Sequence, residues 1–265
     1  MKTAIIVPTY NEIENIRLLT SALLALPIIV EVIVVDDNSP DGTGRLADEM
    51  AVDDPRIVVC HRPSKLGLGT AYVTGFRTAL ARGADRIVTM DADFSHHPRY
   101  VPYVVALTQR ADLGIGSRYV PGGGTMNWGP ERHLLSSGAN TVARVALGLT
   151  VHDCTAGFRC YQRHVLEAID LDSIRSNGYS FLIEMLYYVV NAGFTVAETP
   201  IVFENRQRGS SKISKNEIAK AGLTVARLAR QRYARGAAPR ALRTSSAVGM
   251  VAATLPPETR ERLRN

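Results

Sequence analysis

Four short runs rich in β-branched residues recur through the first hundred residues of this chain. The runs are Ala4–Val7, Val32–Val35, Ile57–Cys60 and Ile87–Met90, and each is separated from the next by a stretch long enough for a helix. Parallel strands need crossover connections of a dozen or more residues, which are usually helices. The pattern therefore predicts an α/β fold, with a mostly parallel, Rossmann-like sheet flanked by helices on both faces.

The second half of the chain carries fewer strand signals. Further strands are predicted at Leu113–Ile115 and Val196–Phe203, and a helix is predicted to begin near Pro130. Residues 121–124 read as a flexible glycine-rich loop. Near the start of the chain, Asn11 and Glu14 have the spacing of a capping box for the first helix.

The C-terminal quarter differs from the rest in charge. The formal net charge is +6 with a pI of about 9.4, and most of the basic excess follows Glu204. Residues 213–235 are predicted to form one basic amphipathic helix, and residues 236–265 a flexible tail. The apolar side of that helix is expected to carry Ile218, Leu223, Val225 and Leu228. Such a basic segment suits an anionic partner: phosphate groups, a lipid surface or nucleic acid.

Composition narrows these choices. Hydrophobic residues make up 46% of the chain and charged residues 21%, as in a globular protein. Aromatic residues make up only 6% and no module for reading bases is legible, so we expect no nucleic-acid partner. Cys60, Cys154 and Cys160 lack zinc-type spacing and are expected to be reduced thiols. No apolar stretch approaches the roughly 18–20 residues that a spanning helix needs.

Two carboxylates, Asp91 and Asp93, follow directly after the fourth predicted strand. Acidic side chains at the carboxyl end of a parallel strand lie where open α/β sheets bind their ligands. Two acids separated by one residue can converge on a hard divalent cation, and Mg²⁺ and Mn²⁺ often share such ligands with substrate phosphates. A pair of solvated turn carboxylates is the alternative for such a motif in isolation.

The other predicted strands also end in polar loops. If the sheet is parallel, the loops that begin at Pro8, Asp36, His61 and Asp91 share one edge and form one crevice. Turn chemistry alone explains the Asn-Ser-Pro-Asp-Gly stretch of the second loop, but it does not explain four convergent loops. The glycines of the third loop match neither the P-loop nor the dinucleotide-binding spacing, so those ligands are not indicated.

Seven polar or glycine-containing stretches follow one another along the chain: Val7-Pro8-Thr9-Tyr10-Asn11-Glu12, Asp36-Asp37-Asn38-Ser39-Pro40-Asp41-Gly42-Thr43, Lys65-Leu66-Gly67-Leu68-Gly69-Thr70-Ala71-Tyr72, Met90-Asp91-Ala92-Asp93, Gly116-Ser117-Arg118-Tyr119, Thr155-Ala156-Gly157-Phe158-Arg159 and Glu204-Asn205-Arg206. In this order, they resemble the inverting family 2 glycosyltransferases, which have the GT-A fold, and among them the dolichyl-phosphate (polyprenyl-phosphate) mannose synthases. The resemblance runs from Ile5 to about Lys212. The resemblance implies a catalytic domain over residues 1–212, followed by the basic helix and the tail.

The resemblance also implies roles for the matching residues. Asp91 and Asp93 are expected to hold Mg²⁺ or Mn²⁺, while a third ligand at Ser95 is in doubt because a hydroxyl is a poorer ligand than an amide oxygen. The expected donor-binding set is Pro8, Tyr10, Glu12, Asp37, Lys65, Asp91, Ala92, Asp93, Arg206 and Lys212. The expected acceptor-phosphate set is Arg118, Arg132 and Ser136. The expected catalytic set is Asp91, Asp93, Arg118, Arg132, Arg206 and Lys212.

The implied reaction is transfer of mannose from GDP-mannose to polyprenyl phosphate with inversion. A UDP-glucose-dependent glucosyltransferase acting on the same lipid class is the alternative, and a non-catalytic basic protein that binds lipid or nucleic acid is a remote one. We expect a peripheral protein on the cytoplasmic face of a membrane, held there by the basic helix or by a separate membrane-anchoring protein.

Four further residues leave alternatives open. His96 and His97 are candidate metal ligands, but capping of a helix entered at Pro98 is favoured. Trp128 either touches lipid or covers the site, and Glu184 is either catalytic or part of a structural salt bridge.

Overall fold

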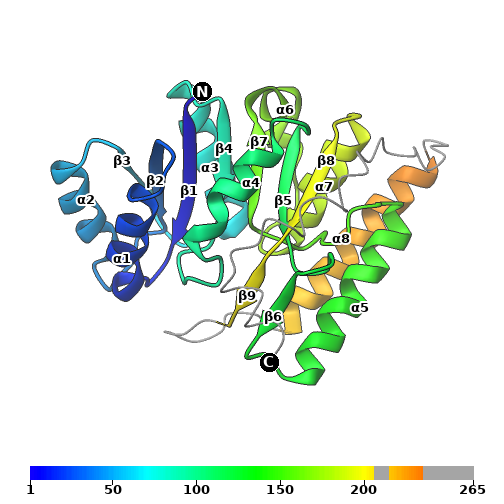
Figure 1. Cartoon of the computed structure of the whole chain (residues 1–265). Coiled ribbons are helices and arrows are strands. Elements are labelled where there is room, and N and C mark those ends of the chain that lie inside the picture. The colour runs from blue at the N-terminus through cyan, green and yellow to red at the C-terminus, as the bar shows by residue number, and fades with distance from the viewer. Residues whose placement is uncertain (206–214, 235–265) are drawn as a thin grey trace.

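A seven-stranded sheet runs through the centre of the molecule, and helices cover both of its faces (Figure 1). The computed structural model describes residues 1–205 and 215–234. The sheet strands are β1 (Thr3–Thr9), β2 (Val30–Asp36), β3 (Ile57–His61), β4 (Arg86–Thr89), β5 (Leu113–Ser117), β7 (Arg159–Gln162) and β8 (Val196–Pro200). They lie in the order β3-β2-β1-β4-β7-β5-β8, and every pairing is parallel except those of β7. The predicted α/β fold with a mostly parallel sheet is confirmed.

The helices that fill the two outer layers follow the predicted alternation. They are α1 (Ile13–Leu24), α2 (Thr43–Asp53), α3 (Leu68–Ala81), α4 (Val101–Leu107), α5 (Pro130–Leu147), α6 (Arg163–Ala168), α7 (Ser180–Asn191) and α8 (Lys215–Ala234), with short 3₁₀ turns η1 (Pro98–Tyr100) and η2 (Leu171–Ser173). Helix α5 begins at Pro130, as predicted. The predicted capping box is wrong: Glu12 is the N-cap of α1 without a side-chain hydrogen bond, and Asn11 is left-handed with φ 58°.

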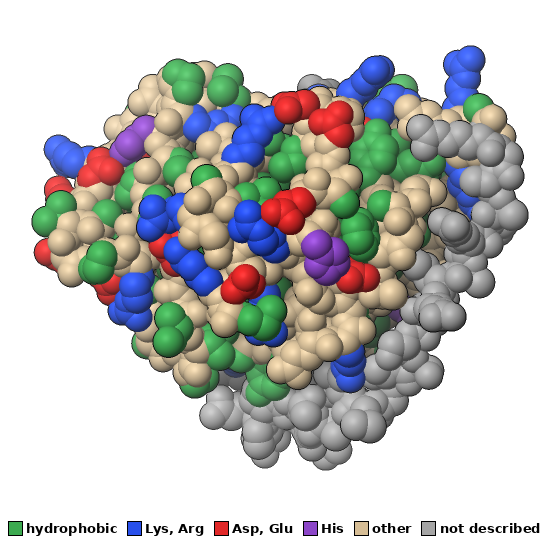
Figure 2. Space-filling model, turned by 90° about the horizontal axis from the view of Figure 1, so that it is seen from above, with side chains coloured by type: hydrophobic (Ala, Val, Ile, Leu, Met, Phe, Trp, Pro, Cys, Tyr) green, Lys and Arg blue, Asp and Glu red, His purple; other side chains and the backbone are tan. Residues whose placement is uncertain are grey.

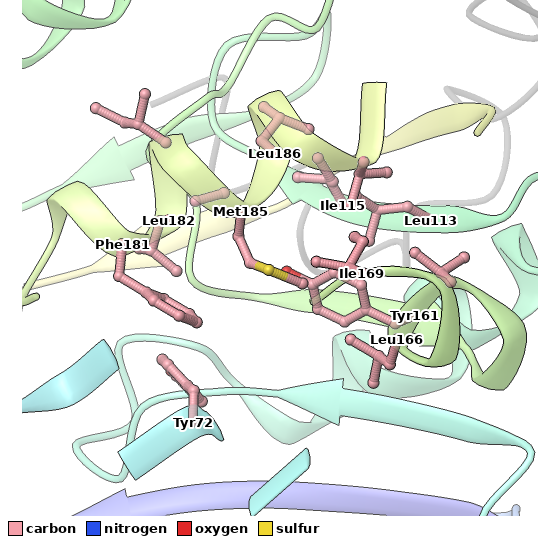
Figure 3. Packing of buried hydrophobic residues seen from close by; sticks show 14 of the residues in the cluster. Tyr72, Leu113, Ile115, Tyr161, Leu166, Ile169, Phe181, Leu182, Met185 and Leu186 are labelled. Carbon is pink, nitrogen blue, oxygen red and sulfur yellow. The ribbon is translucent and has the colours of Figure 1, made fainter. Parts of the chain in front are cut away.

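Two hydrophobic cores lie on opposite faces of the sheet. Along β1, Ala4 and Ile6 belong to one core, while Ile5 and Val7 belong to the other. Burial on both faces explains why the strands appear in the sequence as continuous apolar runs. The larger core packs side chains of α3, α6 and α7 against the sheet, and Figure 3 shows part of it. The labelled members are Tyr72, Leu113, Ile115, Tyr161, Leu166, Ile169, Phe181, Leu182, Met185 and Leu186.

Strand β7 was not predicted. It runs antiparallel between β4 and β5, and its short sequence opens with the charged residue Arg159. Arg159 is fully buried, because its guanidinium donates to the backbone carbonyls of Ala156, Leu182 and Cys154 at 2.8–3.0 Å. A buried arginine with backbone acceptors supplied by distant segments leaves no hydrophobic signal in the sequence.

The prediction of a single strand over Val196–Phe203 is wrong, because two strands, β8 and β9, occupy this segment. The chain leaves the main sheet after Pro200, which has no N–H for a ladder, and Val202–Glu204 forms a separate strand, β9. β9 pairs in parallel with β6 (Gly124–Met126), so the predicted glycine-rich loop ends in a short strand.

Helix α8 packs against α5 and α7, and the three helices lie together at one side of the molecule (Figure 1). Val225 and Leu228 are buried, as predicted for the apolar side, but Leu223 is 73% exposed, so its predicted placement is wrong. The side chain of Ile218 lies outside the described residues, as do residues 206–214 and 235–265. The division of the chain at residues 212 and 235 stays a prediction.

Ion pairs dominate the edge of the sheet at which β1 begins. Glu31 Oε1 forms ion pairs with Lys2 Nζ at 3.3 Å and with Arg82 Nη2 at 2.6 Å. Figure 2 shows this face, on which basic and acidic side chains are intermixed.

All three cysteines are free, and Cys154 and Cys160 are buried. No helix within the described residues is long and apolar enough to cross a membrane.

Candidate functional site: a strand-edge crevice joined to an apolar cavity

The carboxyl ends of β1, β2, β3 and β4 meet at one edge, as the parallel pattern predicted. Thr9 at the end of β1 is the register partner of Asp36, and Asp36 is the partner of His61. Asp36 ties these loops together, because its carboxylate accepts from Thr9 Oγ1 at 2.9 Å and from Ser39 Oγ at 2.6 Å. The four polar loops therefore share one edge of the sheet, the edge at which the sequence predicts a crevice.

Asp37, predicted to bind the donor, lies in this crevice beside Arg62. Their Oδ1 and Nη1 atoms are 2.9 Å apart, and both side chains are buried. Burial raises the pKa of Asp37 above its ordinary value, and the opposing charge of Arg62 only partly offsets this. The sequence did not single out Arg62, which lies within the recognised third loop.

The remaining predicted donor residues surround the same edge. Lys65 Nζ lies 4.2 Å from the centre of the Tyr10 ring, a cation–π contact. Pro8 is half-buried at the end of β1, and Glu12 is buried with Oε2 accepting from Asn15 Nδ2 at 2.9 Å. Glu12 thus has a structural contact in addition to its predicted role.

Gly67 precedes α3 with φ +100° and ψ 158°, a region that only glycine adopts without strain. An added Cβ there would collide with the side chain of Asn177. Asn177 Nδ2 also donates to the carbonyl of Leu66 at 2.8 Å. The donor-side loop is therefore held from outside by the segment that precedes α7.

The Asp91-Ala92-Asp93 motif turns sharply after β4. Ala92 is buried, and Phe94 is left-handed with φ 61°, which bends the chain so that Asp93 Oδ1 accepts from Ser95 N at 3.0 Å. Asp91 is half-buried and accepts from Tyr72 Oη at 3.4 Å. Ser95 itself is buried, and its backbone carbonyl accepts from Glu204 N at 3.4 Å.

The donor set fits a hard divalent cation that is shared with a substrate. Within the described residues, no group of three or more His, Cys, Asp or Glu side chains is arranged around a metal position. Two carboxylates on one sharp turn would leave the other coordination positions to diphosphate and water oxygens, which is the usual arrangement for Mg²⁺ and Mn²⁺.

The two histidines have different roles. His97 caps η1, because its Nδ1 accepts from Arg99 N at 3.1 Å, as favoured from the sequence. His96 is buried and its Nδ1 accepts from the backbone N of Asp91 at 3.1 Å. Burial lowers the pKa of His96, although Asp91 and Asp93 oppose this, and the neutral ring supports the carboxylate turn from behind.

An apolar cavity of about 680 Å³ begins at Asp91 and extends between α5, α7 and α8. Its polar end contains Asp91, His96, Arg118, Arg132 and Ser136. Its apolar end is lined by Leu135, Ala139, Val142, Leu182, Ile183, Ala221 and Val225. Leu135 and Val142 are also more than half exposed, so the cavity reaches the surface beside α5. The three residues predicted to bind an acceptor phosphate therefore line one cavity together with a predicted metal ligand.

Two arginines at the polar end are held by aromatic rings. The Arg132 guanidinium carbon lies 4.3 Å from the centre of the Trp128 ring, and that of Arg118 lies 5.8 Å from it. Phe203 packs edge-on against Trp128, with ring centres 5.6 Å apart. The buried Nε1 of Trp128 has no hydrogen-bond acceptor among the described residues. Trp128 thus packs against both arginines of the polar end, and its contact with lipid stays a prediction.

Arg132 and Ser136 lie one turn apart on α5. Arg132 Nη1 donates to Asn205 Oδ1 at 2.9 Å, and Ser136 Oγ receives the Tyr119 hydroxyl at 2.8 Å. Burial lowers the pKa of Arg132, but a guanidinium stays charged at neutral pH. Arg206 and Lys212, predicted to bind the donor, lie outside the described residues.

Glu184 forms a buried salt bridge, the structural alternative for this residue. Its Oε1 lies 2.8 Å from Arg227 Nη2 of α8, and its Oε2 accepts from Ser176 N at 2.7 Å. Burial tends to raise the pKa of Glu184, but the bonds from Ser176 and Arg227 outweigh it and hold the pKa below the ordinary value. The salt bridge joins α8 to α7.

Comparisons with known proteins agree with this geometry. The family model for "Glycosyl transferase family 2" matches residues 4–170. A polyprenol monophosphomannose synthase from Mycolicibacterium smegmatis is 49% identical over 227 residues, which cover 85% of this chain and 86% of the relative. An undecaprenyl-phosphate mannosyltransferase from Micrococcus luteus is 45% identical over 227 residues, covering 86% of this chain and 93% of the relative.

Solved structures share the fold at low identity. Glucosyl-3-phosphoglycerate synthase from Mycobacterium tuberculosis, in complex with Mn²⁺, UDP and its product, aligns with a TM-score of 0.60 and 19% identity over 86% of this chain and 80% of that one. A mannosyltransferase from Pyrobaculum calidifontis in complex with GDP-Man and Mn²⁺ aligns with a TM-score of 0.53 and 17% identity over 99% of this chain and 83% of that one.

The mostly parallel sheet, with acidic residues directly after its strands, has the GT-A fold of a glycosyltransferase. More particularly, this chain belongs to glycosyltransferase family 2.

Proposed function

We propose that this enzyme transfers mannose from GDP-mannose to polyprenyl phosphate with inversion, giving polyprenyl phosphate mannose. The observation that carries the proposal is the cavity, which is cationic and hydroxylated where it meets Asp91 and apolar where it reaches the surface beside α5. A substrate with a phosphate head and a hydrocarbon tail matches both ends. The names of the two curated relatives support the mannosyl group and the polyprenyl acceptor.

The lining also argues against a small polar acceptor. The structural neighbour from Mycobacterium tuberculosis acts on phosphoglycerate, a water-soluble acid. In the present chain, the cavity beside Arg132 and Ser136 is walled by Ala139, Val142, Ala221 and Val225. Apolar walls give such an acid nothing to bind, whereas they shelter an isoprenoid chain from water.

The donor would lie along the crevice, with its diphosphate at Asp91 and Asp93. The divalent cation would neutralise the charge that develops on the departing diphosphate. Lys65, Tyr10 and Asp37 line the side of the crevice on which we propose the nucleotide. Mn²⁺ in both of the solved neighbours described above supports a divalent cation, and GDP-Man in one of them supports the guanine nucleotide.

The acceptor phosphate is already anionic at neutral pH, so transfer needs positioning and charge neutralisation in place of a general base. Arg132 and Ser136 offer a charge and a hydroxyl from adjacent turns of α5, and Arg118 offers N–H donors from the loop after β5. Attack from the face opposite the diphosphate would convert an α-linked donor into a β-linked product.

We infer that the enzyme sits peripherally on the cytoplasmic face of a membrane, with α5 toward the lipid. Four apolar side chains of α5 are exposed, Leu134, Leu135, Val142 and Val145, and two of them line the cavity mouth. Arg227 of the basic helix is not assigned a membrane contact, because its guanidinium is bound to Glu184. Lys220 and Arg230 of α8 are exposed and remain candidates for contact with anionic headgroups.

A UDP-glucose-dependent enzyme acting on the same lipid is the second candidate, because the cavity would take the same acceptor whichever donor is used. A transfer assay with radiolabelled GDP-mannose and UDP-glucose, each paired with polyprenyl phosphate, tests the proposal. We expect mannose to reach the lipid only in the presence of Mg²⁺ or Mn²⁺ and Asp91. Glucose transfer would establish the second candidate, and no transfer to lipid from either donor would refute both. A non-catalytic lipid-binding protein would bind vesicles with Asp91→Ala as well as without it and would transfer no sugar.

Arg132→Ala tests the acceptor site directly. We expect a loss of about 1.5–3 kcal/mol in transition-state stabilisation, or roughly 10- to 150-fold in kcat/KM for the lipid, because a charge-assisted contact with phosphate is removed. Binding of GDP, followed by fluorescence of Trp128, should be retained. Unchanged kinetics in this variant would place the phosphate elsewhere.

A further inference from the structure

Asp153 is completely buried and gives both carboxylate oxygens to Arg118. Arg118 Nε donates to Oδ2 at 2.8 Å, and Nη2 donates to Oδ1 at 2.7 Å. The backbone N of Arg118 donates to Oδ2 as well, at 3.0 Å, and Thr155 Oγ1 accepts from Nη2 at 2.6 Å. One complete edge of the guanidinium is therefore occupied by protein acceptors.

The rest of the guanidinium is left to the cavity. Of the five N–H groups of an arginine, three lie on Nε and Nη2, which bond Asp153 and Thr155. Nη1 carries the other two, and it has no hydrogen-bond acceptor among residues 1–205 and 215–234, while Arg118 lines the cavity together with Asp91. We propose that Asp153 is a positioning residue, which fixes Arg118 so that Nη1 presents a directed donor to the acceptor phosphate.

Asp153 is itself held from two sides. Glu198 of β8 accepts from the backbone N of Asp153 at 3.0 Å and from the backbone N of His152 at 2.8 Å. On the other side, Asn140 of α5 accepts from Cys154 N at 2.8 Å and donates to the carbonyl of His152. Since α5 also carries Arg132 and Ser136, the same clamp sets Arg118 in register with the rest of the proposed phosphate site.

The ion pair between Asp153 and Arg118 also gives Arg118 and Arg132 different roles. Burial opposes the charged form of both partners, but their mutual attraction raises the pKa of Arg118 and lowers that of Asp153, so both remain ionised. The pair is neutral as a whole. Arg118 would thus contribute direction, while Arg132, whose Nη1 donates to the uncharged amide of Asn205, would contribute net positive charge.

A double-mutant cycle tests whether Asp153 acts through Arg118. Asp153→Asn should lower kcat/KM for polyprenyl phosphate about tenfold or more and leave GDP binding unchanged, because an amide can accept from only one side of the guanidinium edge. In an Arg118→Ala background, the same substitution should cost nothing further in kcat/KM. A residue that only supported the fold would show losses that multiply.

Two additional variants guard the interpretation. Thr155→Val is nearly isosteric and removes the second acceptor of Nη2 together with the hydrogen bond that Thr155 Oγ1 donates to Asp153 Oδ1 at 3.2 Å. A smaller loss that also vanishes in the Arg118→Ala background is expected even if Asp153→Asn folds poorly. Asp112→Asn is the matched control. Asp112 directly precedes β5, at the opposite end of that strand from Arg118, and its carboxylate forms hydrogen bonds with Thr195 and His164. It should lower Tm without changing lipid kinetics, in either background.

The outcomes separate this inference from the proposed function on which it rests. Full activity of Asp153→Asn, or losses that multiply with those of Arg118→Ala, would overturn the positioning role while leaving the acceptor site in place. Full activity of Arg118→Ala would overturn Arg118 as a phosphate contact, and the positioning role with it. The single tryptophan, Trp128, adds a direct readout because its ring lies against Arg118: its emission should change in Asp153→Asn and not in Asp112→Asn.

Discussion

The exposed apolar stripe of α5 gives the sharpest test of how this enzyme meets its lipid. Leu134 and Val145 are 75% and 76% exposed, and they lie about three turns apart on the same face of the helix. Neither residue is among the side chains that line the cavity. The double variant Leu134→Gln with Val145→Gln therefore removes apolar surface from the proposed membrane face and leaves the walls of the cavity intact.

The expected effect follows from the exposed surface. Complete burial of a leucine or valine side chain contributes about 1.5–3 kcal/mol, and three quarters of that is available at each of these positions. The two substitutions should therefore weaken binding to vesicles by about 2.3–4.5 kcal/mol, or roughly 45- to 2000-fold in the partition coefficient. Because the contribution is apolar, most of this difference should persist at high salt, where contacts of Lys220 and Arg230 are screened.

Co-sedimentation with vesicles of neutral and anionic lipids, at low and high salt, measures this partitioning. Ile29→Gln with Val52→Gln is the matched control, because both residues are 87% exposed but lie on the side of the sheet that carries α1 and α2, away from α5 (Figure 1). The control should bind as the wild type does. Equal binding of the α5 variant and the wild type would refute insertion of this face, and absence of wild-type binding would mean that a separate protein anchors the enzyme.

Three further predictions concern the crevice and its supports. Asp91→Asn and Asp93→Asn should each lower transfer by orders of magnitude with little change in Tm, and wild-type transfer that survives EDTA would contradict metal dependence. Glu184→Gln should destabilise the protein by about 1–3 kcal/mol at neutral pH, measured by urea unfolding, because Arg227 loses its buried partner. Since folding lowers the pKa of Glu184, its contribution to stability is present above the unfolded pKa of about 4.3 and is lost as the pH falls. The free energies of unfolding of the wild type and Glu184→Gln should therefore converge in acid. A difference that stays constant with pH would argue against ionisation of Glu184 as the cause. Gly67→Ala should cost about 1–3 kcal/mol of stability through its backbone conformation and should weaken GDP binding, whereas unchanged binding would separate this turn from the donor site.

Much of the catalytic edge could be predicted from the sequence, for a local reason. A buried parallel strand leaves a continuous apolar run, and the polar residues that follow it must lie at the carboxyl edge. The positions of Asp37, Asp91 and Asp93 therefore followed from their place directly after β-branched runs. Arg118 likewise follows a predicted strand, whereas Arg132 and Ser136 lie on α5, where the family resemblance pointed to them.

The tertiary structure decided which partners these residues have. Strand β7 escaped prediction because Arg159 is buried by carbonyls that come from elsewhere in the chain. Leu223 is exposed because it lies two residues from Val225, about 200° around an α-helix, and therefore points away from the face of α8 that packs on α5 and α7.

Long-range contacts also explain the two charged pairs that the sequence could not assign. Asp153 lies 35 positions from Arg118, and Glu184 lies on a different helix from Arg227. Neither Asp153 nor Glu184 has a neighbouring sequence pattern that identifies its partner. An ion pair depends on distance in space, and only the packing of β5, α5, α7 and α8 sets that distance. The sequence by itself determined the positions of the functional residues along the chain. The fold determined which charged side chains form structural ion pairs and which face the cavity proposed for the substrate.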